Sequence, residues 1–228
     1  MLAVGSKQIR SVHVGGKAVT QIRIGSKLIW SASQQADNFN RETLGDLWVP
    51  TGGTAPDRAP IIVNGSVRLN IPSGLISEAT RVGGVRFVGA TATGPDGWLE
   101  FQAATRGADV GHLSTYVCDH APATENLTHF LAVELCASQL YLTRRLPSGT
   151  QRVAECGVYQ PGDIMRMVTN GNVYSLYRQG KFVGVFEDNG NTVVKGDLYR
   201  SMAMLFSGDK GFFGPRRFSA AIDNIEHS

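Results

Sequence analysis

The acidic residues that could form a catalytic pair occur singly in the sequence. Hydrolysis of a glycosidic bond uses two carboxyl groups that flank the bond. Alternate positions on one strand would point two carboxylates to one face, but Glu100, Glu134 and Glu155 each stand alone in a strand pattern. The adjacent Glu187 and Asp188 would point to opposite faces of a strand. The sequence therefore predicts a protein that is not an enzyme, with hydrolysis by another arrangement of groups as the alternative.

The histidines and cysteines form no complete metal site or nucleophilic site in the sequence. Cys118 and His120 would share a face of an extended chain, with His112 nearby, but no further ligand follows at a known metal-binding spacing. A Cys–His nucleophilic pair would also need a third residue to orient the base. The spacings to Cys136 and Cys156 match neither a zinc motif nor a redox CxxC motif. We interpret the cysteines as small core residues and the histidine beside Cys118 as a loop residue.

Four oxygen-bearing side chains stand near the two ends of the strand-rich part of the chain. Asp37 and Asn38 precede its first strands, and Asp223 and Asn224 lie in its last one. Hard oxygen ligands suit calcium, so a Ca²⁺ site between the two ends is one interpretation. The other is that these polar residues hydrogen-bond to the backbone at turns and strand edges. The second interpretation is the simpler one, and the sequence predicts no cofactor.

Three aromatic residues are candidates for stacking on a sugar ring. Trp98 follows the turn sequence Pro-Asp-Gly, and Tyr116 and Tyr141 lie in strand patterns. An exposed aromatic ring offers an apolar face to a ligand, and tyrosine and tryptophan add a polar group. Packing in the core is the alternative for each of the three. We take Trp98, Tyr116 and Tyr141 as the candidate glycan-binding residues.

Composition excludes several classes of protein. The chain has 228 residues with 18% charged residues, 27 glycines and a net charge of +3, which favours many turns and short strands over a helical bundle. The positive charge is too weak and too scattered for nucleic-acid binding. There is no apolar run of 18 residues, so no membrane insertion is expected. The N-terminus meets glycine and charge too early for a signal peptide, which predicts synthesis in the cytoplasm without export.

The first thirty residues contain a repeat with a period of ten. The blocks VGSKQIRSVH, VGGKAVTQIR and IGSKLIW align their glycines, lysines and apolar residues. Alternating apolar residues predict strands of roughly six residues, and each glycine predicts a tight turn. Such a β-meander has one apolar face and is not stable alone, so residues 1–30 are predicted to be an assembly element, or else a hairpin docked on its own domain. The candidate interface residues are Val12, Val14, Val19, Ile22, Ile24, Ile29 and Trp30.

A single all-β domain is predicted for the rest of the chain. The small polar segment SASQQA, residues 31–36, is typical of a linker. Residues 37–228 then alternate strand patterns with turn signals, such as Asn64-Gly65 between two apolar runs. No window of twelve residues has a helical pattern. Many short strands at this spacing indicate a β-sandwich or barrel.

Three segments of residues 34–228 resemble concanavalin A-like jelly-roll domains. The opening DNFNRETLGDLW, the hairpin NVYSLYRQGKFVGVF and the ending FSAAIDNIEHS are similar to segments of that family. The resemblance implies a jelly-roll sandwich in which the last strand pairs beside the first. It does not specify function, because lectins, glycanases and structural modules share the fold.

The decapeptide repeat followed by a jelly roll resembles minor tail proteins of phages that infect actinobacteria. That resemblance implies a virion tail component, made in the host cytoplasm, that contacts other tail proteins through residues 1–30. It also implies a homotrimer and a lectin-like module that binds a glycan of the host cell envelope. A glycan-degrading tail enzyme and a purely architectural tail protein are the alternatives.

Overall fold

The computed structural model consists of β-strands and turns. It describes residues 3–4, 7–8, 12–14, 17–19, 21–24, 27–31, 35–55, 58–71, 80–88, 96–122, 124, 126–196, 198–199, 201–210 and 214–228. No α-helix occurs within these ranges, and so none of the described residues forms a helix that could cross a membrane. The all-β prediction is confirmed.

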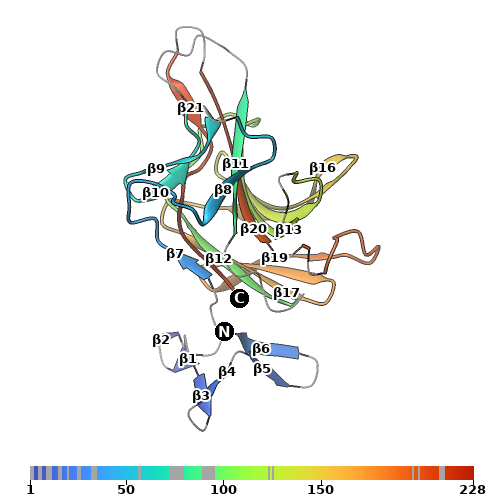
Figure 1. Cartoon of the computed structure of the whole chain (residues 1–228). Helices are drawn as coiled ribbons and strands as arrows, with labels where there is room; N and C mark the ends of the chain where they lie inside the picture. Colours follow the sequence, from blue (N-terminus) through green and yellow to red (C-terminus); the bar gives the residue numbers. More distant parts are fainter. Residues whose placement is uncertain are drawn as a thin grey trace.

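Two antiparallel sheets face each other and form a sandwich (Figure 1). The first sheet has the order β19 (Lys181–Glu187), β18 (Val173–Arg178), β17 (Ile164–Asn170), β12 (Gly97–Ala103), β22 (Ile222–His227), β10 (Ser66–Arg68) and β9 (Ile61–Val63), with β7 (Gln35–Asp37) also paired to β22. The second sheet has the order β16 (Gly149–Val158), β15 (Gln139–Leu146), β14 (Phe130–Cys136), β13 (Ser114–Ala121), β20 (Ser201–Lys210), β11 (Arg81–Phe87) and β8 (Trp48–Thr51), with β21 (Arg216–Phe218) also paired to β20.

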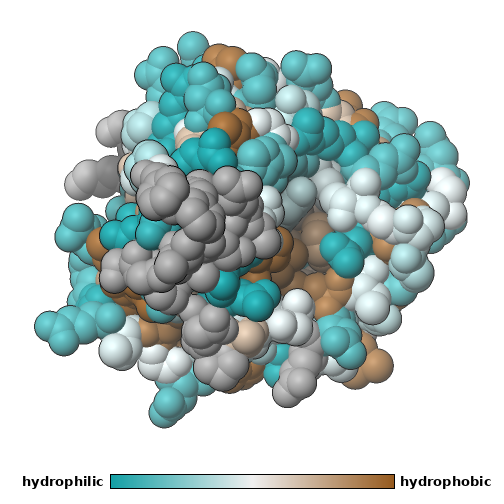
Figure 2. Space-filling view, turned by 90° about the horizontal axis from the view of Figure 1, so that it is seen from above, coloured by the Kyte–Doolittle hydropathy of each residue, from teal (hydrophilic) through white to brown (hydrophobic). Residues whose placement is uncertain are grey.

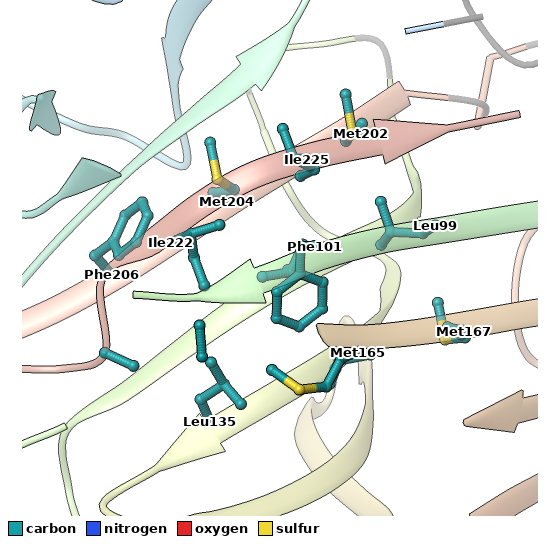
Figure 3. Packing of buried hydrophobic residues seen from close by; sticks show 14 of the residues in the cluster. Leu99, Phe101, Leu135, Met165, Met167, Met202, Met204, Phe206, Ile222 and Ile225 are labelled. Carbon is teal, nitrogen blue, oxygen red and sulfur yellow. The ribbon is translucent and has the colours of Figure 1, made fainter. Parts of the chain in front are cut away.

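Alternate residues of the strands fill the space between the sheets. In a strand, successive side chains point to opposite faces, so every second residue reaches the core. The first sheet contributes Leu99, Phe101, Met165, Met167, Ile222 and Ile225, and the second contributes Val117, Val133, Leu135, Met202, Met204 and Phe206 (Figure 3). The residues between these positions on β13 and β14, and those next to the core residues Leu140 and Leu142 on β15, must therefore face away from this core. That outward face is the one on which the candidate site is built.

The segments that carry the jelly-roll resemblance take the predicted places. β7 and β22 pair antiparallel, with Asp37 opposite Ile225, so the two ends of the domain lie side by side. β18 and β19 form the predicted hairpin, and so do β9 and β10. Asn64 and Gly65 both have a positive φ, 52° and 73°, as a tight two-residue hairpin turn requires.

The N-terminal repeat forms three separate hairpins. They are β1 (Ala3–Val4) with β2 (Lys7–Gln8), β3 (Val12–Val14) with β4 (Lys17–Val19), and β5 (Gln21–Ile24) with β6 (Lys27–Ser31). The sequence predicts a continuous meander of six-residue strands. The described strands instead have two to five residues and pair only within each hairpin. In the sequence, a glycine stands between the two strands of each hairpin, and the segments between hairpins contain no glycine. Of the predicted linker 31–36, residue 31 ends β6, residues 35–36 belong to β7, and 32–34 lie outside the described residues.

A close approach of Arg58 and Leu69 to β11 requires glycine at position 83. A Cβ added to Gly83 would lie 2.2 Å from the carbonyl oxygen of Arg58 and 2.7 Å from Cδ1 of Leu69. Backbone atoms cannot move away cheaply, so Gly83→Ala is expected to lower the free energy of unfolding by about 3 kcal/mol. Gly111→Ala is the matched control, since no atom lies within 4 Å of its added Cβ. Urea denaturation measures both, and equal midpoints for the two variants would disprove the account.

Candidate functional site

The outward face of the second sheet carries one acidic side chain between two tyrosines. Glu134 on β14 pairs with Tyr116 on β13 and with Tyr141 on β15. Residues directly opposite each other in a sheet share a face, so the three side chains lie in a row across the strands. On the next strand, Arg152 of β16 pairs with Thr143 of β15. We call Ser114, Tyr116, Glu134, Tyr141, Thr143 and Arg152 the Glu134 patch.

Glu134 is held by four hydrogen bonds. Its Oε1 accepts from Ser114 Oγ and from Arg152 Nη2, both at 2.7 Å. Its Oε2 accepts from Thr143 Oγ1 at 2.7 Å and from Arg152 Nε at 3.0 Å. Burial of Glu134, which is 2% exposed, works to raise its pKa, but these donors outweigh burial and hold the pKa below its ordinary value. Glu134 is therefore ionised at neutral pH, and it fixes the Arg152 guanidinium in a bidentate pair.

The tyrosines and Arg152 present mixed chemistry at the surface. The guanidinium carbon of Arg152 lies 4.0 Å from the ring centroid of Tyr141, and the Arg152 side chain is 43% exposed. Tyr116 is half-buried and packs on Phe130 with 6.0 Å between ring centroids. Burial, and then the charge of Glu134, raises the pKa of Tyr116 to about 12, so its hydroxyl stays neutral. The patch thus offers aromatic surface, a fixed cation and a neutral hydroxyl.

A second carboxylate shares this face. Glu155 on β16 pairs with Tyr141, so it lies two strand spacings, about 10 Å, from Glu134. Glu100 is in the first sheet, where it accepts a 2.6 Å hydrogen bond from Arg166. The fold therefore brings together two of the three acids that the sequence leaves apart. Glu155 is exposed, whereas both oxygens of Glu134 already accept two hydrogen bonds each.

Of the three predicted aromatic residues, two come together and one does not. Tyr116 and Tyr141 flank Glu134, whereas Trp98 lies on β12 in the other sheet. Trp98 is 8% exposed, and the guanidinium carbon of Arg166 lies 4.3 Å from its ring centroid. Trp98 therefore fits the packing interpretation. Arg152 was missed by the sequence reasoning, and the register of the β14–β15–β16 hairpins is the signal that would have found it.

The histidine and cysteine residues do not meet. His112 lies 2.8 Å from Asp209, while His120 lies 3.8 Å from Asp119 and has φ +51°, which breaks the strand alternation that would align it with Cys118. His120 is buried in β13, so the prediction of a loop histidine is wrong. All three cysteines are free and buried, as predicted. In the described ranges no three His, Cys, Asp or Glu residues are grouped so as to hold a metal ion.

Two of the four residues proposed for calcium, Asp37 and Asn38, are engaged in hydrogen bonds. Asp37 accepts from both terminal nitrogens of Arg41 at 2.6 Å, from Trp48 Nε1 at 2.7 Å and from the Phe39 amide at 2.9 Å. Asn38 accepts from the amide of Asn40 at 3.2 Å. These contacts match the interpretation of Asp37 and Asn38 as turn residues that bond to the backbone. Asp37 also ties the opening segment to the sandwich, which explains the DNFNR…W pattern.

The predicted assembly residues pair across the N-terminal hairpins. Val12 lies opposite Val19, and Ile22 lies opposite Trp30. Val14 is 69% exposed, and Val19 and Ile22 are half-buried. Ile24 lies opposite Lys27 and Ile29 falls at a register shift of β6. The backbone register thus places one apolar pair in each of the second and third hairpins, and it places Val14 and Ile24 opposite lysines.

Acid is expected to destabilise the domain through a set of paired carboxylates. Burial is the largest single influence on these carboxyl groups, and it works to raise their pKa values. Hydrogen bonds and positive neighbours together outweigh burial, so the pKa values lie below the ordinary 3.8 for Asp and 4.5 for Glu. The residues concerned are Asp37, Asp119, Glu134, Asp188 and Asp209. A lowered folded-state pKa contributes stability that is complete above the unfolded-state pKa and is lost as the pH falls. The urea midpoint should therefore fall steeply below about pH 4.5, and less steeply for Glu134→Gln. A midpoint that stays constant down to pH 3 would contradict this.

The fold is similar to that of several solved structures, among them two glucanases and a carbohydrate recognition domain. An endo-β-1,3-glucanase from Pyrococcus furiosus matches with a TM-score of 0.58 at 10% identity, over 96% of this chain and 98% of that one. A Bacillus licheniformis β-glucanase matches with a TM-score of 0.56 at 12% identity, over 85% and 97%. The carbohydrate recognition domain of Emp47p matches with a TM-score of 0.53 at 11% identity, over 84% and 92%. No sequence-family model and no curated protein sequence matches the chain. At these identities the comparison defines the fold, a concanavalin A-like jelly-roll sandwich, as predicted.

Proposed function

We propose that this protein is a glycan-binding module that uses the Glu134 patch and does not cleave its ligand. The observation that carries the proposal is the placement of Tyr116 and Tyr141 on either side of a buried, ionised Glu134. Carbohydrate-binding and carbohydrate-cleaving proteins with the same fold support the choice of ligand class. A host cell-envelope glycan is the ligand that the resemblance to tail proteins implies.

The patch suits a sugar because it combines an apolar surface with fixed polar groups. The half-buried rings of Tyr116 and Tyr141 can cover the apolar face of a pyranose. Arg152 is already oriented by Glu134, so little side-chain entropy is lost when its exposed N–H groups bind a hydroxyl. Glu134 acts as a positioning residue in this scheme, because it holds Arg152 and does not itself reach the surface.

Hydrolysis is disfavoured by the bonding of Glu134. A general acid must carry a proton at working pH, but the pKa of Glu134 is held low. A nucleophile or base needs a free lone pair, but each oxygen of Glu134 accepts two hydrogen bonds. Glu155 alone cannot fill both roles of the two-carboxylate mechanism.

The test is a retention assay with the full-length protein on a panel of insoluble cell-wall polysaccharides, followed by measurement of polymer length. Retention on one or more polymers without shortening is the expected result. Shortening of the polymer would overturn the non-enzymatic assignment. Absence of retention on every polymer would favour the architectural alternative.

We also propose that residues 1–30 attach the protein to a phage tail, as a homotrimer in contact with other tail proteins. The support is the row of three short hairpins along the chain, each of which is too small to be stable without a partner surface. The phage setting rests on the resemblance of the decapeptide repeat followed by a jelly roll. Deletion of residues 1–30 should leave a folded sandwich that no longer enters virions, whereas normal incorporation would refute the attachment role.

A further inference from the structure

A pocket at the edge of the sandwich gathers arginines. It has a volume of about 510 Å³, within the roughly 300–1,000 Å³ that is usual for small-molecule sites. It lies between β9–β10, β21 and residues 104–108, which follow β12. Arg68, Arg106, Arg216 and Arg217 line it, and no acidic residue is among its described lining residues. Figure 2 views the molecule from the end at which β21 lies in Figure 1, and hydrophilic residues predominate on its coloured surface.

One of these four arginines is neutralised by an acid outside the pocket. Arg217 donates to Asp209 from Nε at 2.6 Å and from Nη2 at 2.8 Å. Arg216 instead donates from Nη1 to the carbonyl oxygen of Ile71 at 2.9 Å. A carbonyl oxygen has no net charge, so this contact does not neutralise the Arg216 guanidinium. The pocket therefore keeps a net positive charge.

Arg68 is the least satisfied member of the group. Its Nε is buried without a hydrogen-bond partner, and its guanidinium carbon lies 4.5 Å from the ring centroid of Phe218. Burial, and then the charge of Arg216, lowers the pKa of Arg68. Two guanidinium groups that repel each other and line the same pocket are in the arrangement that an anion would stabilise. Stacking on Phe218 leaves the edge of the Arg68 guanidinium, where its N–H groups lie, free of the ring.

A hydroxyl group completes the set of donors. The Oγ1 of Thr105 accepts a 2.9 Å hydrogen bond from the amide of Ala221, so its own O–H remains available to donate. Ser66 is less suitable, because its Oγ donates to the carbonyl oxygen of Val63 at 3.0 Å. Planar guanidinium groups and a hydroxyl match the oxygens of a carboxylate, sulfate or phosphate group.

We propose that the pocket between Arg68, Arg106 and Arg216 is a binding site for an oxyanion group, carried by a sugar-sized ligand such as an acidic saccharide unit or present as a free anion. The site is separate from the Glu134 patch, which lies on β13–β16. It does not depend on the proposed function. The protein would then have two recognition surfaces, one of which selects for negative charge.

The test is isothermal titration calorimetry of the full-length protein at constant ionic strength. The probes are inorganic sulfate, inorganic phosphate, glucuronate and glucose 6-phosphate, with neutral glucose as the reference. Binding of at least one anion is expected, with Arg68→Gln and Arg216→Gln each weakening it at least tenfold. Arg145→Gln, which removes the same charge from an exposed position on β15, should leave it unchanged.

The outcomes separate the two sources of the anion. Tighter binding of glucuronate or glucose 6-phosphate than of inorganic sulfate and phosphate supports a saccharide ligand. The reverse order supports a free anion. Because Arg216 is exposed, Arg216→Gln keeps the test valid if Arg68→Gln does not fold. Absence of anion binding, or equal weakening by Arg145→Gln, would overturn the proposal.

Discussion

Replacing Glu134 with alanine is expected to lower the free energy of unfolding by about 3 kcal/mol. The variant removes the acceptor of Ser114 Oγ and Thr143 Oγ1 and leaves both hydroxyls buried. It also leaves the Arg152 guanidinium without its carboxylate. An unsatisfied buried donor costs about 1–3 kcal/mol, so these losses together are large for a single domain. Urea denaturation at pH 7 measures the effect.

Glu155→Ala is the matched control for Glu134→Ala. Glu155 lies on the same face of the second sheet, but it is exposed. Its removal should change stability by less than about 0.5 kcal/mol, as is usual for surface positions. If both variants lost the same stability, the hydrogen-bond network around Glu134 would not be the cause.

Replacing Tyr141 with alanine is expected to weaken retention on the bound polysaccharide by about 30-fold. Central tyrosines of a binding surface commonly contribute about 2 kcal/mol or more, which corresponds to that change in affinity. Removal of the ring also leaves Arg152 without its stacking partner. Affinity gel electrophoresis with soluble polymer measures the change.

Tyr177→Ala serves as the control for Tyr141→Ala. Tyr177 lies on β18 in the first sheet, where its ring meets that of Phe182 with 5.9 Å between centroids. It belongs to the opposite layer of the sandwich, so its loss should leave retention unchanged. Weakening by Tyr177→Ala with no effect of Tyr141→Ala would move the glycan site to the first sheet.

The fold could be predicted largely from local patterns. Alternating residues predict the strands, and pairs such as Asn64-Gly65 predict the turns, because both depend on residues close in sequence. The pairing of β7 with β22 was available only from the family resemblance, because 188 positions separate Asp37 from Ile225. The predicted continuous meander of residues 1–30 is replaced by separate hairpins among the described strands. The sequence does not specify whether successive hairpins pair with one another.

The candidate site could be predicted only in part. Residue type predicts Tyr116 and Tyr141 as candidates, but in the sequence their common neighbour Glu134 stands as a lone acid. The row forms across three strands, and its members meet only through the register of the sheet. Trp98 was grouped with the tyrosines because residue type does not reveal which sheet a strand joins.

The most direct test of the glycan-binding account is a map of where a glycan fragment binds. The retention assay identifies a polymer, and a short fragment of it is then titrated into isotopically labelled full-length protein. The account predicts NMR shift changes concentrated on β13–β16, at Tyr116, Glu134, Tyr141 and Arg152. Shift changes confined to β12, β17 and β18 of the first sheet would contradict it.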